Sequence, residues 1–314
     1  MPEFVAPHRA GRPAARFWAL VLAGLVVAPA LTGCIANTTP ESSASLLTAP
    51  SLSASVPATS SPLETTQSSN KAPVYWLGRT GNGVFLYREF RDVPEQENPV
   101  TRALRAMMAD KPLDADFFTP WQNPSKLATS ISGKDTITVD LSEDAFNSNL
   151  DADTALRAVQ QLVYTATAAA ASSGLIDSGQ QIRVRILVDG HTDYMAFGQV
   201  QLGALMTRMP GLSAPVWIID PQENVDLAPG SVKITGRSTV AGGKLRWQIL
   251  RTATNGTTSA FLTGETTAAA DTGGAGLFSL SLTLPVGEYE AKIAQLGPDD
   301  QVDRNEETRF FSVK

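Results

Sequence analysis

The chain has 314 residues, of which 43% are hydrophobic and 18% charged, and its formal net charge is −6. This length fits two domains after an N-terminal extension better than one compact domain. Removal of residues 1–33 as an export signal leaves 22 basic and 30 acidic residues, a net charge of −8. An acidic protein lacks the basic surface that nucleic-acid binding requires, so we expect no nucleic-acid partner.

Cys34 is the only cysteine of the chain. A single cysteine forms no internal disulfide and cannot build a cysteine-rich zinc site. Residues 8–16 before it are basic, and residues 17–31 are apolar without any charge. This apolar run is short for a helix that must cross about 30 Å of hydrocarbon, and the whole pattern is typical of an export signal.

The apolar run ends in Leu31, Thr32, Gly33 and Cys34, which resembles the bacterial lipobox. The resemblance implies a diacylglycerol on the Cys34 thiol and cleavage between Gly33 and Cys34. Two alternatives are an uncleaved membrane anchor and an incidental thiol after an ordinary signal peptide. All three place the rest of the chain outside the membrane, and we predict a lipid-anchored protein on the outer face of the cytoplasmic membrane.

Residues 34–72 are mostly Ser, Thr, Ala and Pro, which predicts a disordered tether. Residues 73–211 then combine strands with helices, which predicts an α+β domain with two helices on a mixed sheet. Its core is expected between the helices and one face of that sheet. The predicted elements are strands at 74–78 and 84–90, a helix at 98–110, a strand at 136–141, a helix at 151–173 and a strand at 182–188.

Helical periodicity disappears after residue 213, and short strands separated by Gly, Pro and Asn turns replace it. This pattern of short strands and turns is typical of an all-β immunoglobulin-like sandwich, which we predict for residues 214–314. The seven predicted strands are 216–220, 231–237, 244–250, 260–265, 276–284, 288–295 and 309–313.

The pieces FLYREFRDV, NPVTRALRAMM, TITVDLSEDAF and RILVDG, in this order, resemble the GerMN domain of sporulation and spore-germination proteins. Residues 215–314, with WIIDPQENVDLAPGSVKITGRSTV and FSLSLTLPVGEYEAKI, resemble the immunoglobulin-like domain often fused after GerMN. The chain departs from the GerMN pattern at residues 110–112, where the family usually has a glycine-proline step. The resemblance implies a binding or assembly module of a cell-envelope complex, without assigned catalytic residues.

Two groups of polar residues suggest other chemistry. Asp189, His191 and Asp193 alternate, so an extended chain would place them on one side as metal ligands, whereas a turn at residues 188–190 would leave them on an exposed loop. The pairs at residues 299–300 and 306–307 suggest calcium, but they lack the glycine and final glutamate of an EF-hand. We interpret them as an acidic, solvated hairpin loop, and we expect no metal and no cofactor.

The sequence therefore predicts a lipid-anchored, non-catalytic module that binds an envelope protein or a cell-wall polymer. Candidate contact residues are Trp121, Asp189, Gly190 and His191, although Trp121 fits a core position equally well. The alternative is a peptidoglycan or glycan hydrolase, which would need two carboxylates facing each other across a cleft, roughly 5–10 Å apart.

Overall fold

The computed structural model describes residues 71–81, 83–133, 135–177, 181–239, 243–268, 275–296 and 303–314. The predicted signal peptide, the lipobox with Cys34 and residues 35–70 of the predicted tether lie outside these ranges. Within the described ranges, no helix combines the length and the apolar character needed to cross a membrane.

The first two strands form the predicted hairpin. β1 (Ala72–Thr80) and β2 (Gly83–Arg91) pair antiparallel along their whole length. The short β3 (Phe117–Phe118) pairs with the other edge of β1, so this sheet has the order β2-β1-β3. Residues 72–78 of β1 are all buried, as expected for a central strand with both faces covered.

The predicted first helix is also present, as α1 (Pro99–Ala109). The side chain of Asn98 accepts a hydrogen bond from the amide of Thr101 at 2.9 Å and caps the helix. A second sheet has the order β4-β5-β6, with β4 antiparallel and β6 parallel to β5. Its strands are β4 (Leu127–Ser132), β5 (Thr136–Leu141) and β6 (Arg183–Val188).

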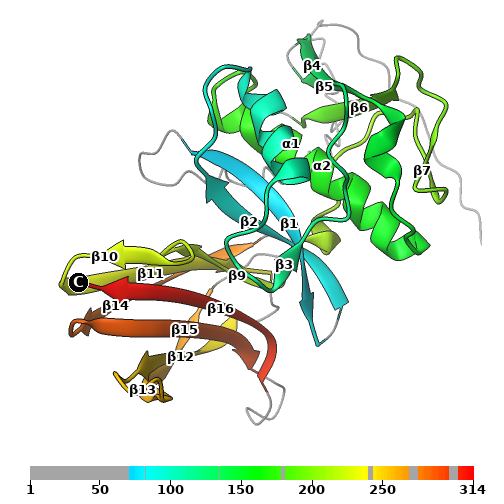
Figure 1. Cartoon of the computed structure of the whole chain (residues 1–314). Helices are drawn as coiled ribbons and strands as arrows, with labels where there is room; N and C mark the ends of the chain where they lie inside the picture. Colours follow the sequence, from blue (N-terminus) through cyan, green and yellow to red (C-terminus); the bar gives the residue numbers. More distant parts are fainter. Residues whose placement is uncertain are drawn as a thin grey trace, which may run out of the picture. The chain divides into compact units, whose positions relative to one another are not determined.

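The long helix α2 (Ala152–Ser172) lies next to α1 (Figure 1) and also contacts β1 and β6. The Asp151 carboxylate caps its start by accepting a hydrogen bond from the amide of Thr154 at 2.9 Å. The helix is followed by Gly174, whose φ of +67° is one that glycine adopts without strain. Both ends therefore lie where the sequence predicts them.

The α+β class is confirmed, but the single mixed sheet expected for this region is wrong. The strands form two separate three-stranded sheets, and α2 contacts strands of both. Every residue of α2 from Ala158 to Ala170 is buried. A helix enclosed on all its faces needs cover on more than one side, and two sheets together with α1 supply it where one sheet would not.

Short elements complete this region. The turn-rich segment after β6 contains the two-stranded hairpin of β7 and β8. The bounds are β7 (Met195–Ala196), β8 (Val200–Gln201) and the 3-10 helices η1 (Glu143–Phe146) and η2 (Pro210–Leu212).

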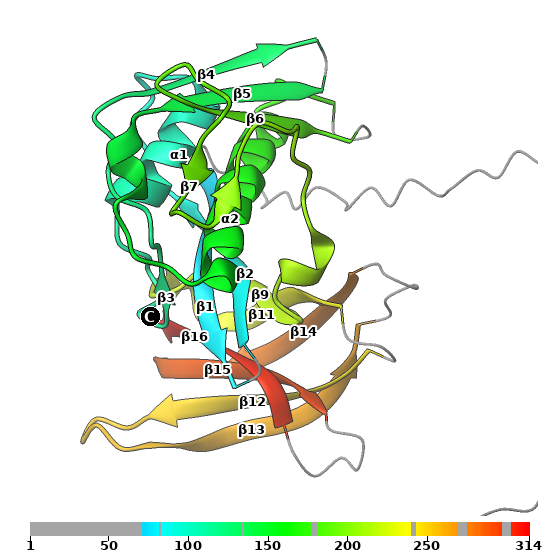
Figure 2. The ribbon, with the colours of Figure 1, turned by 90° about the vertical axis from the view of Figure 1, so that its right-hand side faces the viewer.

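Strands are the only regular secondary structure in the described residues from 215 onward. All seven predicted strands are present, with one more, β10. Two sheets have the orders β10-β16-β15-β12-β13 and β14-β11-β9, and Figure 2 shows β15, β12 and β13 side by side. The bounds are β9 (Val216–Asp220), β10 (Val225–Leu227), β11 (Gly230–Ser238), β12 (Lys244–Thr252), β13 (Thr258–Thr267), β14 (Gly276–Leu284), β15 (Gly287–Leu296) and β16 (Asp303–Val313).

One hydrophobic core joins these two sheets. Ile234 and Phe278 contribute from the smaller sheet, and Leu245 and Ile293 from the larger one. The finer assignment of this two-sheet arrangement to the immunoglobulin-like class stays a prediction. We refer to residues 71–214 as the α+β part and to residues 215–314 as the β part.

The chain passes directly from one part into the other. The amide of Ala214 donates to the carbonyl of Leu86 in β2 at 3.0 Å. Trp217 of β9 is 8% exposed and belongs to the hydrophobic core of the α+β part. The boundary predicted near residues 211–215 therefore lies within a packed segment.

Candidate functional site

The predicted contact residues Asp189, Gly190 and His191 follow β6 in a tight turn. Val188 and His191 exchange two backbone hydrogen bonds of 2.9 Å, which leaves Asp189 and Gly190 at the centre of the turn. Both central residues have positive φ angles, +48° and +81°. Aspartate and glycine tolerate this conformation better than other residues, which explains the Asp-Gly pair.

Carboxylates hold the turn in place. The amide of Gly190 donates to the Asp140 carboxylate at 3.0 Å, and the Asp189 carboxylate accepts from the amide of Glu143 at 3.3 Å. The extended backbone that would put Asp189 and His191 on one side as metal ligands is absent here. Across the described residues, no group of three or more His, Cys, Asp or Glu side chains is arranged to hold a metal ion.

Trp121 occupies the core position that the sequence allowed as the alternative to a contact role. Its side chain is 3% exposed, and its indole nitrogen donates to the carbonyl of Ala158 in α2 at 3.0 Å. Its ring lies 5.1 Å from those of Phe146 and Phe197, between centroids. The physical reason is that the loop before β4 turns this large ring inward, where its nitrogen finds a buried acceptor.

The sequence did not identify the residues that extend the turn on its surface. Tyr194 is partly exposed, Met195 is 46% exposed, and the Tyr194 hydroxyl donates to the Glu143 carboxylate at 3.5 Å. Desolvation and the nearby carboxylates of Glu143 and Asp189 raise the pKa of Tyr194. We call this region the turn surface; it consists of Asp189, Gly190, His191, Tyr194 and Met195.

Phe197 anchors the turn surface to the core. It has a φ of +52°, a conformation that strains a bulky side chain, yet it is 8% exposed and packs against Trp121 and Phe146. The burial of its ring offsets the backbone strain and fixes the β7–β8 hairpin. No local sequence signal predicts a positive φ at a phenylalanine, so this anchor was not foreseen.

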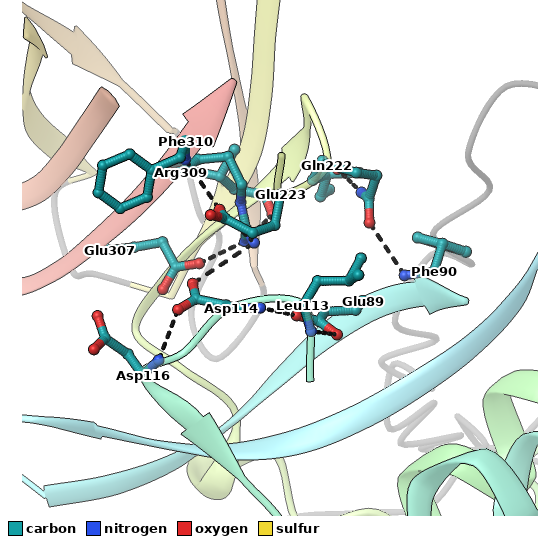
Figure 3. A network of polar contacts seen from close by, with 12 residues as sticks. Glu89, Phe90, Leu113, Asp114, Asp116, Gln222, Glu223, Glu307, Arg309 and Phe310 are labelled. Atoms are coloured by element: carbon teal, nitrogen blue, oxygen red, sulfur yellow. Dashed lines mark hydrogen bonds and ion pairs between the residues drawn. The ribbon is translucent and has the colours of Figure 1, made fainter. Parts of the chain in front are cut away.

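A second group of functional interest is a cluster of charges contributed by both parts of the chain (Figure 3). We call it the charged junction; it consists of Glu89, Asp114, Glu223, Glu307 and Arg309. The Arg309 guanidinium lies 2.8 Å from the Glu307 carboxylate, 3.6 Å from that of Glu223 and 3.7 Å from that of Asp114. The four side chains of these contacts are 3–9% exposed.

Backbone amides complete the charged junction. The Glu89 carboxylate accepts from the amides of Leu113 and Asp114 at 2.9 and 2.8 Å, and the Glu223 carboxylate accepts from the amide of Phe310 at 3.0 Å. These bonds orient the Glu89 and Glu223 side chains in addition to the contacts with cations. The charged junction is therefore a fixed arrangement rather than a set of loose surface ion pairs.

Burial dominates the electrostatics of the charged junction. Desolvation raises the pKa of Glu223 to about 7, although the amide of Phe310 and the Arg309 cation partly oppose it. Desolvation also raises the pKa of Glu89 and Asp114, and that of Glu307 strongly, again against the Arg309 cation. Burial thus shifts these carboxyls toward the neutral form, whereas the Arg309 cation favours the charged form.

The charged junction corrects the interpretation of residues 306–307 as a solvated acidic loop. Glu306 is exposed, but Glu307 is 3% exposed and paired with Arg309; residues 299–300 lie outside the described ranges. A hydrolase would also need paired carboxylates that a polymer can reach. The carboxylates of Asp114 and Glu223 both lie near the Arg309 guanidinium. Their side chains are only 9% and 5% exposed, so a polymer has little access to them.

Residues 73–194 match the model of the Germane family, described as "Sporulation and spore germination". The match covers less than half of the chain, falls within the α+β part, and supports the GerMN resemblance found in the sequence. Among curated proteins, none matches the chain.

Solved structures similar to this chain include two of the same protein. One is the first GerMN domain of the sporulation protein GerM from Bacillus subtilis, at 18% identity and a TM-score of 0.34, covering 45% of this chain and 98% of that one. The other holds the tandem GerMN domains of the same protein, at 16% identity and a TM-score of 0.36, covering 63% of this chain and 61% of that one.

Proposed function

We propose that this chain is a lipid-anchored envelope protein that acts by binding, and that it presents the turn surface to a partner protein on the outer face of the cytoplasmic membrane. The lipobox-like residues 31–34 support the anchor. The Germane match supports the GerMN resemblance, and that resemblance implies a role in an envelope assembly. The β part, which resembles an immunoglobulin-like sandwich, serves in this proposal as a spacer beside the binding part.

The observation that carries the binding proposal is the construction of the turn surface. His191 and Met195 are exposed on backbone that the Asp140 carboxylate and the buried Phe197 ring hold in place. A contact surface whose backbone is already ordered loses little conformational entropy when a partner binds. An exposed methionine beside a partly exposed tyrosine is typical of the composition of protein interfaces.

The anchor is tested by labelling cells with an alkyne fatty acid and fractionating their membranes. The native chain should carry the label and sediment with the membrane, and Cys34→Ala should lose both properties. Label on the Cys34→Ala variant, or membrane retention without label in the native chain, would contradict lipidation at this cysteine.

The contact is tested by photocrosslinking in native membranes. A photoreactive amino acid at Met195 or His191 should give one adduct of the same size, whereas the same group at Thr283, an exposed residue of β14, should not. Equal adducts at all three positions would refute the turn surface as the contact. Degradation of purified peptidoglycan by the intact protein would instead support the hydrolase alternative.

A further inference from the structure

We infer that the charged junction is a proton-controlled lock between the α+β part and the β part, closed at mildly acidic pH and loosened as the pH rises through neutrality. This inference goes beyond the proposed binding function and does not depend on the identity of the partner.

Four segments of the chain supply the charges. β2 carries Glu89 and Arg91, whose side chains are 3.6 Å apart, and the loop after α1 carries Asp114 and Asp116. The loop between β9 and β10 carries Glu223, and β16 carries Glu307 and Arg309. Tyr87 of β2 also faces Glu307 and Asp114, but burial and these carboxylates raise its pKa far above neutrality.

The balance of these charges is negative. When Glu89, Asp114, Glu223 and Glu307 are all ionised, Arg309 and Arg91 offset only two of the four charges, and Asp116 adds a further carboxylate at the edge. Full ionisation thus leaves uncompensated negative charge in a region that is almost excluded from water, which is unfavourable unless the region opens. Protonation of one or two carboxyls removes this excess.

At the lock, contacts of Arg309 and of Phe90 connect the two parts. Arg309 of β16 reaches Asp114 at 3.7 Å, and the guanidinium lies 6.0 Å from the ring centroid of Phe117. The amide of Phe90 in β2 donates to the Gln222 side chain at 3.1 Å, as Figure 3 shows. Since these contacts adjoin the carboxylates, repulsion among ionised groups acts at the place where the parts meet.

The sign of the pH effect follows from the direction in which the pKa of Glu223 is shifted. Its pKa is raised from an ordinary value of 4.5 to about 7, so the closed lock favours the neutral acid. The stabilisation is fully present below the ordinary value and is lost as the pH rises through about 7. Glu89, Asp114 and Glu307 are shifted in the same direction and add to the effect.

Hydrogen exchange of the full chain between pH 6 and pH 8 tests the inference, after correction for the intrinsic rate at each pH. The amides of Phe90 and Phe310 report on the lock because they donate to Gln222 and Glu223. Amides of β5 and β6 serve as the reference. If Glu223 regains its ordinary pKa on opening, protection of the reporters should fall about tenfold relative to the reference.

Two substitutions with one matched control complete the test. Glu223→Gln and Glu307→Gln each remove one ionisation at nearly the same shape, and either should flatten the pH dependence. Glu306→Gln changes an exposed neighbour on the same strand and should leave it unchanged. Reporter protection that follows the reference at every pH, or equal flattening by Glu306→Gln, would overturn the lock.

Discussion

Glu307 and Arg309 lie two residues apart on β16, and their side chains meet at 2.8 Å although each is only 3% exposed. Alternate residues of a strand point to the same side. The side chains of Glu307 and Arg309 therefore lie on the same face of β16 as the buried Phe311 and Val313. A strand that otherwise inserts apolar side chains thus places an ion pair against the α+β part. Arg309 is therefore the cation around which the charged junction is organised.

Arg309→Met should be strongly destabilising. Methionine keeps much of the apolar stem, but it leaves the carboxylates of Asp114, Glu223 and Glu307 without their shared cation. Removal of one partner from a buried ion pair typically costs about 3–5 kcal/mol. Scanning calorimetry of the native chain and the variant measures the difference.

Arg304→Met is the matched control, because Arg304 lies on the same strand and is exposed. A surface substitution of this kind should stay within about 0.5 kcal/mol of the native chain. The double variant Arg309→Met with Glu307→Gln should be less destabilised than Arg309→Met alone, since one unpaired charge is then removed. Equal losses for Arg309→Met and Arg304→Met would mean that the network does not stabilise the fold.

Local signals allowed much of the fold to be predicted from the sequence. Asn98, Asp151 and Gly174 mark helix ends through their own hydrogen bonding or backbone freedom, and each lies where it was expected. The separation into two sheets was not predictable in this way. It depends on the enclosure of α2, which arises from contacts between residues far apart in the chain.

The candidate sites show the same difference between local signals, which the sequence reveals, and contacts between distant residues, which it does not. The Asp189–Gly190 turn was predictable because its residue types suit positive φ angles. Glu307 was misread as solvated because the strand at its position was predicted to begin only at residue 309, whereas β16 starts at Asp303. A longer strand would have placed Glu307 in register with the buried positions 309, 311 and 313.

Gly190→Ala should destabilise the chain by about 1 kcal/mol. A Cβ at this position would meet no atom within 4 Å, so the cost comes only from the φ of +81°, which alanine adopts with strain. Gly211→Ala introduces the same methyl into equally open space without a positive φ, and it should be nearly neutral. Denaturant titration of both variants decides the point, and equal stabilities would contradict the turn geometry.

Trp121→Phe should lower stability without changing partner binding. The substitution removes the hydrogen bond from the indole to the Ala158 carbonyl and part of a buried ring, which together cost about 2 kcal/mol. Met195→Ala should weaken partner binding with little effect on stability, because that side chain is 46% exposed. Denaturation midpoints and photocrosslinking through His191 measure the two effects, and loss of the adduct in a folded Trp121→Phe variant would restore Trp121 as a contact residue.

The N-cap of α2 predicts a pH effect of opposite sign to that of the lock. Hydrogen bonds from the amide and the hydroxyl of Thr154 lower the pKa of Asp151 below its ordinary value of 3.8. Its stabilisation is therefore present above that value and is lost as the pH falls through the lowered pKa. Asp151→Ala should reduce Tm by about 2–4 °C at pH 7 and by less near pH 3.

Asp151→Ser provides the control for this N-cap, because a serine hydroxyl accepts the same bond from Thr154 without titrating in this range. Its Tm relative to Asp151→Ala should show a smaller dependence on pH than that of the native chain. The measurement is a series of thermal melts from pH 3 to pH 7 on the three proteins. If Asp151→Ala lies below the native chain by the same interval at every pH, the carboxylate charge does not contribute to the cap, and α2 starts there for reasons of backbone geometry alone.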